Sequence, residues 1–267
     1  MIQKTQYLIG GLFAAILVAG GIFYVYRDLS PFSGTVGSGV MAPSPSIAGD
    51  STGEAAVTKL PLSGGGAILP PAPSLDRPIV FSASFSVEAQ ELMRVKIAEL
   101  TAILKADSSD FAAWMNLGIR RKQVEDYEGA RQAWEYASAL QPENNIAYHN
   151  LGILFHYHLK DYAKAEQNFK ISLQKNTTYP QTYSELHDLY RYSYKQNTTA
   201  AVDILKQGLI ATNNNNNLLV TLARYYRDVK EDTANARLYF TQAYDAAVAA
   251  GDTKLVDTLN AEMSALK

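Results

Sequence analysis

The chain has 267 residues, a formal net charge of −2 and no cysteine. The nearly balanced charge argues against nucleic acid as the main partner. The lack of cysteine excludes disulfides, thiolate metal sites, a cysteine nucleophile and the lipidated cysteine that anchors a bacterial lipoprotein.

The first segment, residues 7–26, contains no charged residue and is long enough as a helix to cross about 30 Å of hydrocarbon. We interpret residues 1–27 as an N-terminal transmembrane anchor. A cleaved signal peptide is the alternative, but the apolar run continues past its small residues and no small-x-small cleavage site follows. Lys4 precedes the span and Arg27 follows it. This weak positive-inside bias places the N-terminus in the cytoplasm and the rest outside, in what we expect is a prokaryotic cell envelope.

Small residues recur every four positions in this span, at Gly11, Ala15 and Ala19. Such spacing lets two membrane helices approach closely, so a homodimer through the transmembrane helix is possible. Small residues are also common in membrane spans that do not pair.

Residues 28–80 are dominated by Gly, Ser, Pro and Ala. Such a composition cannot bury enough apolar surface to offset chain entropy, so we predict a disordered linker with a reach on the order of 40 Å. We interpret the proline cluster at residues 70–73 as stiff linker rather than a binding motif.

The next segment, residues 86–105, is amphipathic and has Ser86 as a plausible N-cap. One broad face holds Leu92, Val95, Ile97, Leu100, Ile103 and Leu104. We expect this helix to cap the N-terminal end of the helical array that follows.

One pattern of large and small residues then occurs twice. The first copy has Trp114, Leu117, Gly118, Ala130, Trp134, Ala137 and Pro142, and the second has Tyr148, Leu151, Gly152, Ala165 and Phe169. Matched positions are 34 or 35 residues apart. The pattern resembles a tetratricopeptide (TPR) repeat. The resemblance implies an all-α fold over residues 81–267, a TPR-like right-handed α-solenoid of antiparallel helix pairs.

The residue types suit close helix packing. A glycine inside a helix costs about 1 kcal/mol relative to alanine, so Gly118 and Gly152 indicate that another helix comes close there. Asp126 and Asp161 are expected to cap the second helix of each pair.

The pattern weakens further along the chain but continues. We place clear repeats at about 111–144 and 145–179, degenerate repeats at about 180–215 and 216–249, and a C-terminal capping helix at about 252–266. In the third copy His187 stands where the glycine would be, which puts tight packing there in doubt.

No catalytic motif is present: the sequence lacks HExxH, a Gly-rich phosphate loop and GxSxG. His149 and His156 are two helical turns apart, about 10 Å, which is too far to share one metal ion. We therefore expect exposed or groove-lining histidines, no metal, no cofactor and no enzymatic activity.

The resemblance implies that the first helix of each repeat lines a concave groove that binds a peptide or a partner helix. By position in this sequence, the groove residues are Asn116, Ile119, Lys122, Gln123, His149, Asn150, Ile153, His156, Tyr157, Glu185, Asp188, Arg191, Tyr192, Arg224 and Arg227. Asn150 fits the family's carboxylate clamp, but Ile119 and Glu185 do not, so we do not expect that clamp.

The sequence thus predicts a membrane-anchored TPR scaffold that binds another protein or peptide. One alternative is a structural spacer that oligomerises through its transmembrane helix. A second is an enzyme with an unrecognised site on the helical repeats.

Overall fold

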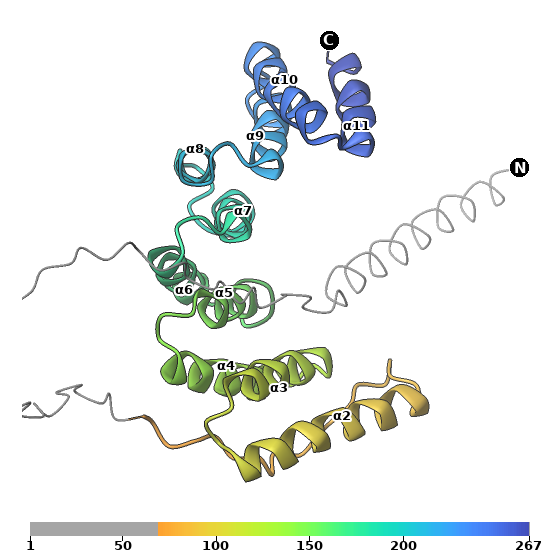
Figure 1. The fold of residues 1–267 in the computed structure, drawn as a ribbon, viewed down its shortest axis with the longest axis vertical. Helices are drawn as coiled ribbons and strands as arrows, with labels where there is room; N and C mark the ends of the chain where they lie inside the picture. The colour runs from red at the N-terminus through yellow and green to blue at the C-terminus, as the bar shows by residue number, and fades with distance from the viewer. Residues whose placement is uncertain (1–68, 267) are drawn as a thin grey trace, which may run out of the picture. The chain divides into compact units, whose positions relative to one another are not determined.

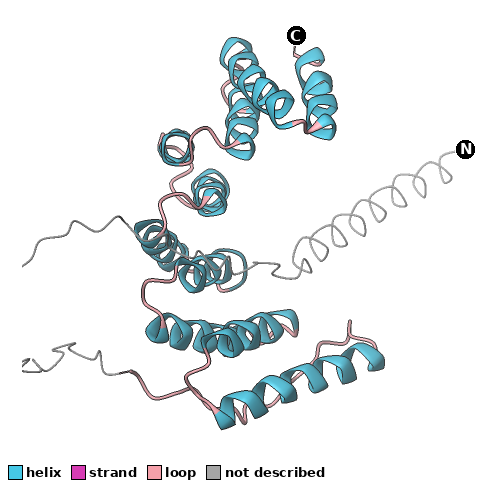
Figure 2. Ribbon diagram, in the orientation of Figure 1, coloured by secondary structure: helices cyan, strands magenta, loops and turns pink. Residues whose placement is uncertain are grey.

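The computed structural model describes residues 69–266 of the chain. The predicted membrane span at 7–26 and most of the predicted linker lie outside the described residues. Within them the chain forms ten α-helices and two π-helical segments, and it contains no strand (Figures 1 and 2). No helix in this part of the chain is long and apolar enough to span a membrane.

The helices follow one another with short connections. They are α2 (Val87–Ala106), α3 (Phe111–Gln123), α4 (Tyr127–Leu140), α5 (Asn145–Ile153), η1 (Leu154–His158), α6 (Tyr162–Lys175), α7 (Pro180–Asp188), η2 (Leu189–Ser193), α8 (Ala200–Ala211), α9 (Asn216–Asp228), α10 (Thr233–Ala250) and α11 (Thr253–Ser264). The π-helical segments η1 and η2 continue α5 and α7 directly.

Each helix packs mainly against the next one along the chain. The pairs α3–α4, α5–α6, α7–α8 and α9–α10 are four helix hairpins, while α2 packs on α3 and α11 packs on α10 (Figure 1). This order confirms the expectation of an all-α array of TPR-like helix pairs.

Small residues sit where the helices of a pair approach most closely. Gly118 lies against the ring of Trp134, and Gly152 lies against the ring of Phe169. Both rings are almost completely buried. In the third pair a buried histidine, His187, takes the place of the glycine. Its Nδ1 lies 2.8 Å from the carbonyl oxygen of Ala201 on α8.

The turn inside each pair repeats one backbone conformation. Glu125, Lys160, Lys195 and Glu231 all have positive φ, at 65°, 56°, 62° and 53°. In three of the four turns, the next residue is an aspartate whose side chain caps the following helix: Asp126, Asp161 and Asp232. The predicted N-caps at Asp126 and Asp161 are therefore confirmed, as is Ser86 at the start of α2.

An irregular segment, residues 69–85, precedes α2; we call it the arm. It runs antiparallel to α2, since Asp76 pairs with Lys105 at 2.9 Å and the carbonyl of Phe85 accepts from Gln90 Nε2 at 3.1 Å. Composition placed residues 69–80 in the linker, whereas the structure packs Leu75 and Ile79 against the core. Once α2 is folded, these two side chains, which alternate with prolines in the sequence, have an apolar surface on which to pack.

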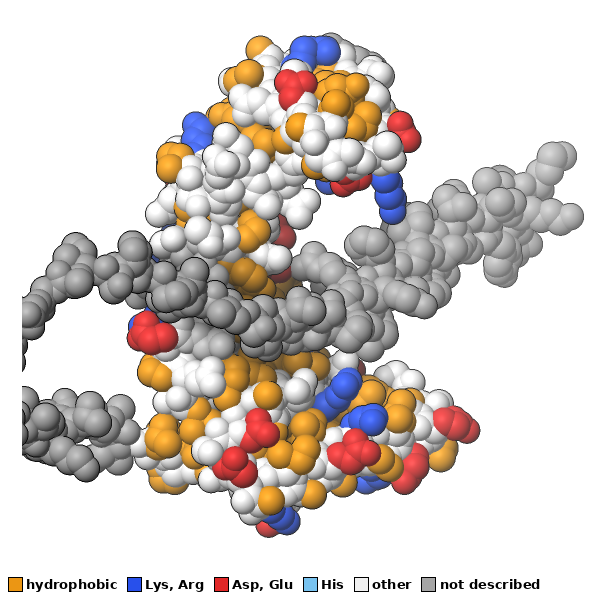
Figure 3. Space-filling model, viewed as in Figure 1, with side chains coloured by type: hydrophobic (Ala, Val, Ile, Leu, Met, Phe, Trp, Pro, Cys, Tyr) orange, Lys and Arg blue, Asp and Glu red, His pale blue; other side chains and the backbone are white. Residues whose placement is uncertain are grey.

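The surface around α2 is neither purely polar nor purely apolar: hydrophobic side chains lie there among acidic and basic ones (Figure 3).

Candidate functional site

The first helices of the second and third repeats lie side by side and are joined by polar contacts. Between α5–η1 and α7–η2, His156 Nε2 lies 2.9 Å from Ser193 Oγ. One residue further on, the hydroxyl of Tyr157 donates to Glu185 Oε2 at 3.0 Å. We call the face shared by α3, α5–η1, α7–η2 and α9 the A-helix surface.

A second, fully buried contact lies deeper between the same repeats. His149 Nδ1 is 2.9 Å from Thr182 Oγ1, which in turn lies 3.2 Å from Ser172 Oγ on α6. Buried polar groups need such partners, because each one left unpaired costs roughly 1–3 kcal/mol. The contact therefore fixes how the second repeat packs on the third.

Aromatic rings lie beside Arg191, near the end of the first helix of the third repeat. The guanidinium of Arg191 lies 4.7 Å from the ring centroid of Tyr192 and 5.9 Å from that of Tyr225 on α9. Tyr192 is 57% exposed, so this cation–π cluster opens to solvent. It offers a partner one cationic group and one aromatic face.

The arginines of α9 are engaged by the last helix. Arg224 Nε donates to Glu262 Oε1 at 2.9 Å, Arg227 also pairs with Glu262, and Arg227 Nε pairs with Asp228 at 2.6 Å. Sequence reasoning missed Glu262. The apolar spacing of α11 predicts that Met263 packs on the repeats, but it does not indicate that the neighbouring Glu262 pairs with arginines of α9.

Two π-helical turns shape the A-helix surface at the same point of two repeats. In η1 the amide of Leu159 donates to the carbonyl of Leu154 at 3.0 Å, and in η2 the amide of Tyr194 donates to that of Leu189 at 2.7 Å. Single π turns occur frequently at functional sites. Helical periodicity does not distinguish them from ordinary α-helix, so the sequence did not indicate them.

The structure distributes the predicted groove residues over three levels of exposure. Asn116, Tyr192 and Arg224 are exposed; Ile119, Lys122, Gln123, Asn150, Ile153, Tyr157, Asp188, Arg191 and Arg227 are partly buried; His149, His156 and Glu185 are buried. The expectation of exposed or groove-lining histidines thus fails for His149 and His156, because both rings fill the interface between repeats.

Burial also sets the protonation of the interior histidines. Burial, with a smaller contribution from the charge of Lys160, lowers the pKa of His156 to about 4. Burial likewise lowers the pKa of His187, while its hydrogen bond to the Ala201 carbonyl opposes this shift. Both rings are therefore neutral at pH 7.

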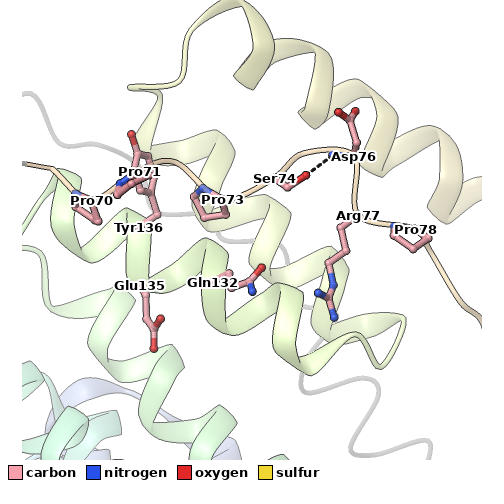
Figure 4. Close-up of a pocket in the computed structure, with 10 residues that line it drawn as sticks. All are labelled: Pro70, Pro71, Pro73, Ser74, Asp76, Arg77, Pro78, Gln132, Glu135 and Tyr136. Atoms are coloured by element: carbon pink, nitrogen blue, oxygen red, sulfur yellow. Dashed lines mark hydrogen bonds between the residues drawn. The ribbon is translucent and has the colours of Figure 1, made fainter.

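Among residues 69–266, no group of three His, Asp or Glu side chains is placed to hold a metal ion. A cavity of about 650 Å³ lies instead between the arm and α4 (Figure 4). The arm contributes Pro70, Pro71, Pro73, Ser74, Asp76, Arg77 and Pro78, and α4 contributes Gln132, Glu135 and Tyr136. None of these residues belongs to the A-helix surface.

No family model matches the chain. Tetratricopeptide repeat protein 37 of Xenopus laevis is 30% identical over 101 residues, which is 38% of this chain and 6% of that protein. The chain thus matches only a small fraction of this relative's length.

Several solved structures also resemble the chain. MamA matches with a TM-score of 0.48 and 16% identity over 63% of this chain and 98% of that one. PilF of Pseudomonas aeruginosa matches with a TM-score of 0.44 and 25% identity over 65% of this chain and 77% of that one. PilW, described as a widely conserved type IV pilus biogenesis factor, matches with a TM-score of 0.44 and 20% identity over 66% of this chain and 86% of that one. The four helix pairs α3–α10 and the match of 101 residues to a tetratricopeptide repeat protein together show that the helix pairs are TPR-like.

Proposed function

We propose that the chain is a protein-binding scaffold whose A-helix surface holds a peptide or a helix of another protein. The observation that carries this proposal is the cluster of Arg191, Tyr192 and Tyr225. It combines a cation, an exposed aromatic ring and a rigid setting between two repeats. Aromatic and arginine side chains of this kind contribute most of the binding energy at many protein interfaces.

The rigidity of this surface supports binding rather than mere spacing. The contacts between Tyr157 and Glu185 and between His156 and Ser193 fix the neighbouring helices before a partner arrives. A surface that is already ordered loses less conformational entropy on binding. Half-buried polar side chains around it favour a polar peptide partner of moderate affinity.

Site-specific photo-crosslinking tests the proposed surface. A photoreactive residue replaces Tyr192 in the full chain, and a control chain carries it at Ile210, which is 86% exposed on α8. We expect a discrete crosslinked partner from position 192 only, and we expect Asn150→Ala with Arg191→Ala to abolish it while helicity is kept. Equal crosslinking from both positions, or capture that survives the double substitution, contradicts the proposal.

We further propose that residues 7–26 anchor the scaffold in a membrane, with the repeats on the extracytoplasmic side of a cell envelope. A tethered module raises the local concentration of a nearby partner to roughly millimolar values. Carbonate extraction of native membranes tests the anchor, and protease accessibility of the repeats in intact cells tests the orientation. Release by carbonate, or protection of the repeats, contradicts the respective part of the proposal.

A further inference from the structure

The two ends of the helical array differ in how many large hydrophobic side chains they expose to solvent. Terminal elements of repeat arrays need a polar outer face, and α11 satisfies this because it has no large exposed hydrophobic side chain. The N-terminal end does not. Six of the eleven large exposed hydrophobic residues among residues 69–266 lie at or before position 103: Leu69, Val80, Val87, Leu92, Val95 and Ile103.

Helix α2 has three distinct sides. One side packs on the core through Ile97 and Leu104, which are 3% and 1% exposed. A second side carries the arm, through contacts of Arg94 with Phe81 and of Lys105 with Asp76.

The third side of α2 has no helix against it among the described residues, as the order of helix packing shows. It presents Leu92, Val95 and Ile103, which are 53%, 44% and 46% exposed. The helical period places these three on one strip. We call this strip the α2 outer face.

Two charged residues lie within the same strip. Lys96 and Glu99 are 44% and 56% exposed and pair with each other at 3.3 Å. The apolar pair Leu92 and Ile103 and the charged pair Lys96 and Glu99 share one midpoint, between residues 97 and 98. When two copies of α2 lie antiparallel about that midpoint, Leu92 of each copy faces Ile103 of the other. Lys96 of each copy likewise faces Glu99 of the other.

We propose that the α2 outer face docks against the same face of a second copy of this chain. This goes beyond the proposed function, since it concerns a different surface and a different partner. In a twofold self-contact the same patch must complement itself, so each interacting pair must be centred on the same point of the helix. The apolar pair and the charged pair of α2 meet this requirement. An unrelated partner helix imposes no such symmetry.

The contact is small, with three half-exposed apolar side chains from each copy. It falls below the area of a standard stable interface, so the self-contact is weak. It becomes populated where the local concentration is high.

A charge-swap experiment tests this pairing in the full chain, kept in detergent micelles. Because the sequence has no cysteine, Glu88→Cys and Ala106→Cys introduce the only thiols, one near each end of the α2 outer face. They lie about 27 Å apart in one helix, so only two copies can be joined by a disulfide. The initial rate of oxidative crosslinking reports the antiparallel contact.

Three variants of this doubly substituted chain are compared with it. Lys96→Glu and Glu99→Lys each place like charges across the pairing, so each alone crosslinks at least about tenfold more slowly. An equimolar mixture of the two places opposite charges together again and recovers a rate within about twofold of the parent. The double swap, Lys96→Glu with Glu99→Lys, recovers in the same way.

Two controls make the result decisive. Circular dichroism verifies that each variant keeps its helicity, and a chain with a single cysteine at Ile210 gives the rate of random collision. Overturning results are single variants that crosslink as fast as the parent, a parent no faster than the Ile210 control, or a mixture as slow as its components. A parent no faster than the Ile210 control assigns the α2 outer face to another occupant, such as the chain's own N-terminal segment.

Discussion

Gly118 faces the indole of Trp134 so closely that a Cβ on Gly118 would lie 2.3 Å from Trp134 Nε1. The ring cannot easily move away, because Nε1 donates to the carbonyl of Met115 at 3.1 Å. In the next repeat a Cβ on Gly152 would lie 2.4 Å from the ring of Phe169. The glycine is thus a packing requirement that both clear repeats share.

We predict that Gly118→Ala destabilises the protein by about 1–3 kcal/mol, because overpacking forces the indole or the helix to shift. Intrinsic helix propensity alone predicts the opposite, a gain of about 1 kcal/mol. The sign of the change in unfolding free energy, measured by urea denaturation, therefore decides between the two effects. A second variant, Gly118→Ala with Trp134→Leu, should lose less than the sum of its single changes.

The arm is held by one buried arginine. Arg121 on α3 is 3% exposed; its Nη2 donates to the carbonyl of Arg77 at 2.8 Å and its Nη1 to that of Pro78 at 3.2 Å. Asp126 accepts from both arginine side chains, at 3.1 Å from Arg121 and 2.8 Å from Arg77. The arm therefore supplies acceptors that a buried guanidinium needs.

We expect Arg121→Met to cost about 3 kcal/mol of unfolding free energy, since it leaves two carbonyl groups and part of Asp126 without a donor. The adjacent Arg120, which pairs with Gln123 at 2.9 Å and is only partly buried, provides the control. Arg120→Met should change stability by less than about 1 kcal/mol. Equal effects in thermal and chemical unfolding of the two variants would show that the arm contacts contribute nothing specific.

Removal of residues 69–80, the part of the arm that contacts Arg121, should have a comparable effect. A chain that begins at residue 81 should unfold at a lower denaturant concentration than one that begins at residue 69. Identical midpoints for the two chains would mean that residues 69–80 add no stability.

A fourth prediction concerns the positive φ angles in the turns. Lys160 has φ of 56°, a conformation that costs an L-residue roughly 1–2 kcal/mol but costs glycine little. Lys160→Gly should therefore stabilise the protein by about 0.5 kcal/mol, after allowing for the greater entropy of glycine in the unfolded chain. Lys164→Gly, four residues later in α6, should destabilise it by about 1 kcal/mol. Two losses of equal size in the same denaturation assay would refute this account.

The sequence was sufficient to predict the helix pairs because their signals are local. Trp114 with Gly118, and the aspartate caps at Asp126 and Asp161, depend on residues a few positions apart. The arm was not predictable in this way, because Arg121 meets the carbonyl of Arg77 across 44 positions of the chain. Composition alone therefore placed residues 69–80 in the linker.

The candidate site was predicted only in outline. Repeat spacing located the helices of the A-helix surface, but it could not distinguish His156, whose ring is buried, from Tyr192, whose ring is exposed. Both residues lie in π turns, η1 and η2, and the extra residue in each turn shifts the side chains around the helix relative to a regular α-helix. A period of 3.6 residues carries no information about such a shift.

The last prediction follows from the buried ring of His156. Its pKa is lowered to about 4, mainly by burial, whereas an unperturbed histidine has a pKa near 6.5. Between these two values the unfolded chain binds a proton that the folded chain does not. Stability contributed by the neutral ring is therefore complete above about pH 6.5 and is lost as the pH falls toward 4.

This ring should account for a loss of about 2 kcal/mol in unfolding free energy between pH 7.5 and pH 5. The pKa of His187 is shifted in the same direction, so it adds to the loss. His156→Gln has no titrating ring, and its curve of unfolding free energy against pH should be flatter by about that amount. Between pH 7.5 and 8.5 the two chains should show the same pH dependence, which serves as the internal control. Parallel curves down to pH 5 would mean that His156 keeps an ordinary proton affinity in the folded protein, and that its ring is not sealed between the second and third repeats.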